Sequence, residues 1–326
     1  MINVKFDKRF DLIFGLMYSV NKDHNCGFYW VGSFYPEYDD AFYEIYKKGI
    51  TPEFEQYIKN GGLNSYNRSI SIANSLNEQY EVIVNSDIQS LQKRPNFDAI
   101  KLSNYLKEFV EKSGYEKFYE SFEPLRSELL QEFNQALNHF VKFEPSLIED
   151  FYGYKIAPME IILLNFSRGS YGMIFEKSIA YVAGMQMYKY SEKRFMKSII
   201  GNLFHEFSHP YLNPLGQKHF ESKDLKNVLR NSKENGLANY YNVPITVINE
   251  YVVRAVSAIL LSRYVEGELE YEININMSQG FTYIREVIEL FSKKDNYETF
   301  EDFYKNEIVL FFKELNKSLE VIDHQK

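Results

Sequence analysis

The residues with the clearest chemical potential are His205, Glu206 and His209 in the stretch HEFSHP. The two histidines are four positions apart on a predicted helix, so both imidazoles project from one face and can reach the same metal ion. Glu206 is rotated around the helix to a position where its carboxylate can take the proton of metal-bound water instead of binding the metal. The stretch therefore predicts a hydrolytic zinc site with two ligands and a general base.

An alternative interpretation of this stretch is a pair of solvated histidines on an amphipathic helix. Leu203, Phe204 and Phe207 stand beside the pair, and such apolar neighbours favour burial. A buried neutral imidazole needs a polar partner, and a metal ion is a ready one. The metal site is therefore the preferred interpretation.

Catalytic zinc usually takes three protein ligands, so a third must lie elsewhere in the chain. Leu212 and Leu215 occupy the positions where the HExxHxxGxxH pattern has Gly and His, which excludes that subgroup. Glu250 is the favoured third ligand, because it shares an apolar helix with Arg254 and a buried carboxylate needs compensation. A simple ion pair between Glu250 and Arg254 is the alternative. Four other candidates are interpreted as solvated loop groups: His219, Glu221, Asp224 and Glu234.

The two histidines need a helix to hold them, and the sequence predicts one over Glu192–His209. Ser191 can cap its first turn, and Pro210 is expected to end it. A polar loop is expected over Asn213–Asn239, and a second, strongly apolar helix over Ile245–Tyr264. The two helices would bring the candidate ligands together.

Strands are expected in one block upstream of this helix. Short apolar runs over Met159–Asn165 and Ser178–Gly184 predict a small sheet. The tail predicts two more helices, at about Phe281–Phe291 and Phe300–Leu319. Strands grouped between helices indicate a mostly helical α+β fold.

The first half of the chain reads as helical. Apolar residues recur at helical spacing from about residue 8 to 150, and Leu12–Val20 is expected to form an amphipathic helix. We therefore expect a helical N-terminal region over residues 1–149 and a catalytic region over residues 150–326.

Composition and charge limit the partners and the compartment. The 326 residues carry a formal net charge of -8, which argues against binding nucleic acid or an anionic membrane, since both need a basic face. Cys26 is the single cysteine, so no internal disulfide and no cysteine-rich metal site can form. No run of 18 apolar residues occurs, so we expect no membrane insertion. The early apolar run lacks a cleavage pattern, which predicts a cytoplasmic protein as written, or a secreted one if a signal was removed.

HEFSH followed by Asn249 and Glu250 in a second helix resembles the gluzincin class of zinc metallopeptidases, with its thermolysin-like architecture. More narrowly, HEFSHPYLNPL, NEYVVRA and the tail segments GFTYIREVIELF and YETFEDFY are similar to a bacterial family of predicted metalloproteases described as a domain of unknown function. This similarity covers most of residues 95–315. It implies a zincin-like catalytic region in which one zinc ion is held by His205, His209 and Glu250.

The resemblance also implies how a substrate would be held. An edge strand of the upstream sheet, at Tyr171–Phe175 or Ile179–Gly184, would pair with an extended peptide. A Tyr or His would donate to the developing oxyanion. Tyr241 is the best match for this donor, and three residues stand behind it: Tyr240, Tyr211 and His219.

The chain departs from the thermolysin-like pattern at Arg254, where that pattern has an Asp. Arg254 can hold the Glu250 carboxylate but cannot accept a hydrogen bond from a histidine ligand, so the groups around the ligands must differ. Asn213 is expected to fix the loop after the first helix. Asn249 is a further candidate for supporting the ligands.

These residues together predict a zinc metallopeptidase acting on a peptide or protein substrate, of undefined oligomeric state. Zinc would lower the pKa of its water toward about 7, and Glu206 would take the proton and return one to the leaving amine. One alternative is a zinc hydrolase of another amide or ester. The other is a helical interaction protein with an aromatic-rich N-terminal half and a vestigial or structural metal site.

Overall fold

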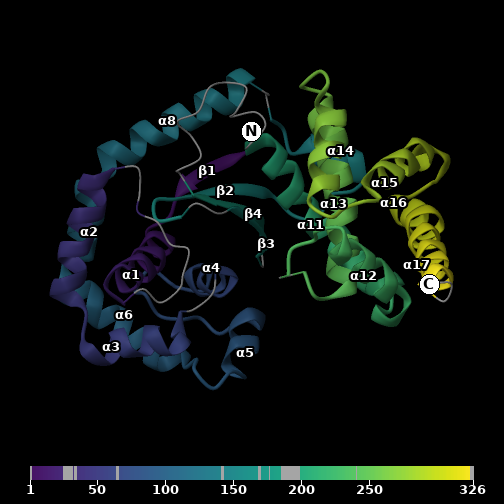
Figure 1. Cartoon of the computed structure of the whole chain (residues 1–326). Coiled ribbons are helices and arrows are strands. Elements are labelled where there is room, and N and C mark those ends of the chain that lie inside the picture. The colour runs from purple at the N-terminus through teal and green to yellow at the C-terminus, as the bar shows by residue number, and fades with distance from the viewer. Residues whose placement is uncertain are drawn as a thin grey trace.

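The centre of the molecule is a four-stranded sheet with helices on both faces (Figure 1). Its strand order is β1 (Asn3–Phe6), β2 (Met159–Leu164), β4 (Ile179–Gly184) and β3 (Ser170–Ile174). Strands β1, β2 and β4 are parallel, whereas β3 pairs antiparallel with β4 and forms one edge. The two predicted strands are confirmed as β2 and β4, and the α+β, mostly helical class is confirmed with them.

The computed structural model describes most of the chain, and the predicted cap Ser191, the helix start at Glu192 and the fallback donor Tyr240 lie outside the described residues. The described residues are 2–24, 32, 35–63, 66–140, 143–167, 170–175, 177–184, 199–239 and 241–323.

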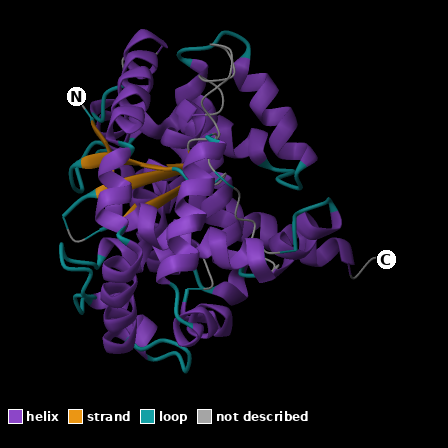
Figure 2. Ribbon diagram, turned by 90° about the vertical axis from the view of Figure 1, so that its left-hand side faces the viewer, coloured by secondary structure: helices purple, strands orange, loops and turns teal. Residues whose placement is uncertain are grey.

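The sheet separates two hydrophobic cores. Along β2, Ile161 and Leu163 face one core, while Ile162 and Leu164 face the other. A strand buried on both faces needs apolar residues at consecutive positions, which is why residues 161–164 are all apolar and all buried. Figure 2 shows the strands enclosed between helices.

The first core lies under the N-terminal helices, which confirms the helical reading of this half. The expected helix at residues 12–20 lies inside α1, but it is not amphipathic, because residues 10–17 are all buried. The helical elements of this half are α1 (Lys8–His24), α2 (Pro36–Gly49), α3 (Pro52–Tyr57), η1 (Ile58–Gly62), α4 (Tyr66–Asn74), α5 (Ser86–Gln92), α6 (Ala99–Ser113), α7 (Tyr115–Ser121), α8 (Glu123–Phe140) and α9 (Ser146–Tyr152).

The second core lies under the C-terminal helices. The predicted second apolar helix is confirmed as α13, and the tail helices are confirmed within α15 to α17. The expected polar loop after residue 213 is wrong, since this segment contains the end of α11, η4 and α12. The elements are α11 (Gly201–His219), η4 (Ser222–Leu225), α12 (Lys226–Glu234), α13 (Pro244–Ser262), α14 (Glu268–Ser278), α15 (Ile284–Leu290), η5 (Phe291–Asn296), α16 (Phe300–Phe303), η6 (Tyr304–Val309) and α17 (Leu310–Asp323).

Pro210 does not end the helix, contrary to expectation. Helix α11 continues to His219 with Pro210 and Pro214 inside it. Pro210 has no N–H for the carbonyl of Glu206, and that carbonyl oxygen lies where strand β3 approaches the helix at Gly172. Burial of residues 210–212 and 215–216 against the core holds the helix together across both prolines.

Helix α13 is the one described helix long and apolar enough to cross a membrane by length and composition, and 67% of its most apolar window is buried inside the protein. A buried core helix passes the same test.

The predicted division of the chain into regions 1–149 and 150–326 stays a prediction. Strand β1 of the N-terminal region pairs with β2 of the catalytic region in the same sheet.

Asp11 is a buried carboxyl group whose ionisation should make the stability of the fold depend on pH. Tyr38 donates to Asp11 Oδ2 at 2.6 Å and Asn165 donates to Oδ1 at 2.8 Å. Burial raises the pKa of the Asp11 carboxyl to about 6, although these hydrogen bonds lower it. The pKa of an unfolded Asp is about 4, so the folded protein holds this proton more tightly, and ionisation destabilises the fold as the pH rises from about 4 to about 6.

Asp11→Asn carries no charge. Its unfolding free energy relative to wild type is expected to increase by up to about 3 kcal/mol between pH 4 and pH 7, since about two pH units separate the two pKa values. Urea unfolding at each pH measures this difference, with exposed Asp40→Asn as the control. Parallel stability curves for wild type and Asp11→Asn would contradict the prediction.

Candidate metal centre

Helices α11 and α13 bring His205, His209 and Glu250 together. The two Nε2 atoms of the histidines are 3.2 Å apart. Glu250 Oε1 lies 3.4 Å from His209 Nε2, and Glu250 Oε2 lies 3.7 Å from His205 Nε2. Ligand atoms of all three residues therefore converge on one point where a metal ion can be held.

The protonation state of His205 suits a metal ligand. Burial lowers the pKa of His205 well below its usual value, and the neighbouring His209 and Arg254 lower it further. The imidazole is then neutral at pH 7, which is the form that binds a metal.

The Glu250 carboxylate is held by two more groups. Arg254 Nε donates to Glu250 Oε2 at 3.3 Å, and the Tyr241 hydroxyl donates to the same oxygen at 3.2 Å. Arg254 is itself fixed by Asn276 Oδ1 at 2.7 Å, and its guanidinium lies 4.3 Å from the centre of the Phe281 ring. The predicted pairing of Glu250 with Arg254 is present, so one buried carboxylate faces both the histidines and a cation.

Asn213 and Asn249 occupy different places. Asn213 lies inside α11, not in a loop, and its Oδ1 is 3.4 Å from His209 Nδ1. It can therefore set the orientation of the His209 ring through the nitrogen that faces away from Glu250. Asn249 packs on Gly216, where a Cβ would overlap its side-chain oxygen, so its contact is made where the two ligand-bearing helices meet.

Glu206 lies beside this group, and strand β3 fixes its carboxylate. The Gly172 N–H donates to Glu206 Oε2 at 2.6 Å. A Cβ at position 172 would overlap the Glu206 carbonyl oxygen, so this close approach of strand and helix requires glycine. Burial raises the pKa of Glu206 to about 8, against the hydrogen bond from Gly172, and the Glu250 carboxylate adds to the rise. A carboxyl perturbed in this way is typical of a site of proton transfer.

The other candidates lie elsewhere. His219 Nε2 is 2.8 Å from Glu301 Oε1, and Tyr211 stacks on Tyr152 with ring centres 4.3 Å apart. Glu221 pairs with Lys223 and Glu234 with Arg230 at the surface. These side chains have their own partners away from the three converging ligands.

A second group of ligand-type side chains lies at the end of α1. Its members are Asp23, His24 and Glu55. His24 Nε2 is 2.9 Å from Glu55 Oε1, and Tyr46 donates to the same oxygen at 2.8 Å. Tyr43 donates to Asp23. Asp23 and His24 are exposed, whereas Glu250 is buried and both of its histidine neighbours are partly buried, so the group on α11 and α13 is the stronger candidate.

A cavity of about 230 Å³ opens next to His205 and Glu206. Asn202, Glu272 and Asn276 give it a polar lining, and sequence reasoning pointed to none of them. Gly172 was also missed as a site residue. The one available signal was a lone glycine within a strand, which often marks close backbone approach.

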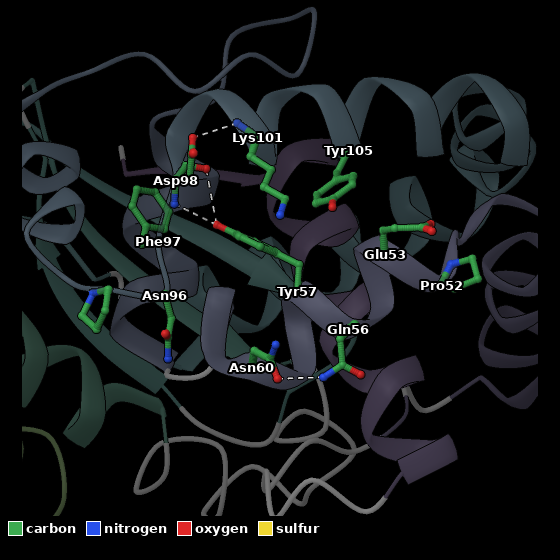
Figure 3. Close-up of a pocket in the computed structure, with 11 residues that line it drawn as sticks. Pro52, Glu53, Gln56, Tyr57, Asn60, Asn96, Phe97, Asp98, Lys101 and Tyr105 are labelled. Atoms are coloured by element: carbon green, nitrogen blue, oxygen red, sulfur yellow. Dashed lines mark hydrogen bonds between the residues drawn. The ribbon is translucent and has the colours of Figure 1, made fainter.

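A larger cavity, of about 650 Å³, lies among the N-terminal helices and is lined from residues 52–60 and 95–105 (Figure 3). The Tyr57 hydroxyl accepts the Asp98 N–H at 3.2 Å, and Lys101 Nζ lies 5.6 Å from the centre of the Tyr105 ring. Its lining shares no residue with α11 or α13 in the described chain, so it is separate from the candidate metal centre.

Fold and site together define a mostly helical α+β protein with a candidate metal centre of two histidines and one glutamate. The chain belongs to the DUF4932 family, a domain of unknown function, whose family model matches residues 59–318. No curated protein and no solved structure matches the chain.

Gly172→Ala tests the approach of β3 to α11. The added methyl group meets backbone, not a movable side chain, so we expect a loss of about 1–3 kcal/mol in unfolding free energy. Gly201→Ala is the matched control, because its methyl group meets Leu261 Cδ2 at an ordinary 3.5 Å. Equal urea midpoints for the two variants would show that Gly172 is not needed for this contact.

Proposed function

We propose that this protein is a gluzincin-type zinc metallopeptidase, with His205, His209 and Glu250 as ligands and Glu206 as general base. The observation that carries the proposal is the convergence of three ligand atoms beside a separately fixed carboxylate. Two histidines and a glutamate are a usual donor set for catalytic zinc, leaving one position open.

The spacing of the donor atoms fits this metal. Four ligand atoms arranged tetrahedrally at about 2.0–2.1 Å from zinc lie roughly 3.3 Å from one another. The two histidine Nε2 atoms are 3.2 Å apart, and each lies near a different oxygen of Glu250, His209 at 3.4 Å from Oε1 and His205 at 3.7 Å from Oε2. These separations are close to that value, and either oxygen of Glu250 could supply the third ligand atom.

Glu206 is proposed to act first as general base and then as general acid. Bound zinc would supply Lewis-acid activation of water and of the scissile carbonyl. Burial raises the pKa of Glu206 to about 8, which favours the protonated form that can deliver a proton, whereas the positive charge of a bound metal would favour the carboxylate that accepts one. Gly172 holds the carboxyl group in one orientation. Glu206 would accept a proton from the attacking water and deliver one to the leaving amine nitrogen.

The edge of β3 that faces away from β4 supports a peptide as the substrate. Phe175 N–H donates to Ser178 O at 2.8 Å, so in the alternating antiparallel pattern the backbone groups of Gly172 and Ile174 point away from β4. The Gly172 N–H already donates to Glu206 Oε2, so an extended peptide would pair with the other outward-facing backbone groups of this edge, among them those of Ile174. Of the two segments expected to receive it, β3 is at the edge and β4 lies inside the sheet.

Tyr241 stays the proposed oxyanion donor. Its hydroxyl lies 3.2 Å from Glu250 Oε2 and 3.4 Å from Arg254 Nη2, which puts it next to a proposed ligand. In the resting protein this hydroxyl also helps Arg254 to hold the carboxylate. The Tyr241 hydroxyl could donate its hydrogen bond to the substrate oxygen instead of to Glu250 Oε2.

Metal content tests the ligand set. After zinc loading and dialysis, elemental analysis is expected to give about one zinc per wild-type chain, with most of it lost in Glu250→Ala. His219→Ala is the control, since His219 lies on the same helix as His205 and His209 but pairs with Glu301. Full zinc retention by Glu250→Ala, or loss in His219→Ala, would contradict the assignment.

Glu206→Gln tests the general base. The amide keeps the shape of the side chain but cannot accept the proton, so we expect turnover of quenched peptides to fall by at least about a hundredfold. Zinc content should stay at the wild-type level. Activity that survives this substitution would exclude Glu206 as the base, and cleavage of ester substrates alone would point to a hydrolase of another class.

A further inference from the structure

The cavity among the N-terminal helices combines aromatic rings with polar side chains (Figure 3). It is lined by α3 and η1 and by the segment from Pro95 to Tyr105, which runs into α6. Its volume of about 650 Å³ falls within the range usual for sites that bind small molecules. The polar groups that its wall leaves unused indicate what could bind there.

Tyr57 and Tyr105 form an aromatic surface in this cavity. Their ring centres lie 5.6 Å apart with 57° between the ring planes, and Tyr105 stacks on the buried Phe54 with ring centres 5.0 Å apart. The Tyr57 hydroxyl accepts the Asp98 N–H at 3.2 Å and donates to the Asp98 carbonyl at 3.4 Å. These contacts fix both rings and engage the Tyr57 hydroxyl, so Tyr57 offers a guest its ring.

Lys101 places a positive charge beside the aromatic surface. Its Nζ lies 6.0 Å from the centre of the Tyr57 ring and 5.6 Å from that of Tyr105. These distances are near the outer limit of a cation–π contact, so the ammonium flanks the rings without packing on them. Among the described residues it has no hydrogen-bond acceptor and no ion-pair partner. Its three N–H groups are therefore available to a guest.

Amide and carboxylate groups complete the lining. Gln56 Nε2 donates to Asn60 Oδ1 at 2.7 Å, which leaves the Gln56 oxygen and the Asn60 nitrogen as the unused ends of the pair. Asn96 and Glu53 are exposed, and neither side chain forms a hydrogen bond or an ion pair with the residues that the structure describes. The cavity thus presents unused donors and unused acceptors together.

This lining favours an uncharged guest with many hydroxyl groups. An apolar guest would desolvate the polar groups without giving them partners. The carboxylates of Glu53 and Asp98 oppose an anion, and the Lys101 ammonium opposes a cation at the rings. A hydroxyl group both donates and accepts hydrogen bonds, so several hydroxyls on one guest can meet the carboxylates, the amides and the ammonium at once.

A saccharide ring carries such hydroxyls and also an apolar face of C–H groups. Aromatic ring faces attract the weakly positive hydrogens of such a face. A proline-rich peptide also packs on tyrosine rings, but proline has no N–H to donate, so acceptors such as the Gln56 oxygen would lose water without a replacement. We propose that the cavity binds an uncharged saccharide, with a sugar ring against Tyr57 and Tyr105. Its hydroxyl groups bond to Lys101 and to the amides.

Isothermal titration calorimetry on the full chain tests this proposal with neutral saccharides. The panel contains glucose, galactose, mannose and N-acetylglucosamine, with disaccharides built from each. At least one of them is expected to bind with a Kd of about 1 mM or tighter. Chelation of metal should not change that Kd, because the described lining of the cavity shares no residue with α11 or α13.

Two substitutions locate the binding site. Lys101→Met removes the ammonium of an exposed side chain and should raise the Kd at least about tenfold, and Asn96→Ala should raise it about threefold or more. Lys93→Met is the matched control, because Lys93 is an exposed lysine at the end of α5, outside the lining. No binding by any saccharide of the panel, an unchanged Kd in Lys101→Met, or an equal loss in Lys93→Met would overturn the proposal. Binding of a proline-rich peptide or of inorganic phosphate in place of the saccharides would overturn it too.

Discussion

The buried carboxylate of Glu250 is the constraint on which the candidate centre depends. It lies on the most apolar of the described helices and is 8% exposed, and an uncompensated charge there would be costly. Arg254 and Tyr241 compensate it from one side, and the two histidines face it from the other. Removing Arg254 would leave the buried carboxylate without its cation, so Glu250 links α13 to the histidines of α11 and, through Arg254 and Asn276, to α14.

A second contact links the sheet to this arrangement. Strand β3 reaches α11 only because Gly172 has no side chain, and there its N–H meets the Glu206 carboxylate. Pro210 leaves the Glu206 carbonyl without a helical partner at the same place. The edge strand therefore fixes the position of the proposed base, whereas the packing of α11 against α13 fixes the positions of the proposed ligands. The proposed base and the two histidines lie on the same short stretch of α11.

Much of the centre could be predicted because its signals are local. His205 and His209 share a helix face, and Glu250 with Arg254 breaks an otherwise apolar helix, so spacing alone indicated the group. Prediction failed where long-range contacts decide the structure. Strand β1 has four residues and forms only by pairing with β2, and α11 passes through Pro210 because burial offsets the lost hydrogen bond. Asn202, Glu272 and Asn276 meet at the cavity from helices far apart in sequence, which no local pattern reveals.

The most direct test of the central claim is anomalous diffraction at the zinc edge from crystals of the zinc-loaded protein. We expect one strong peak bounded by His205 Nε2, His209 Nε2 and the Glu250 carboxylate, at about 2.0–2.1 Å from the nitrogens. A peak at Asp23, His24 and Glu55 alone, or none at either place, would contradict it.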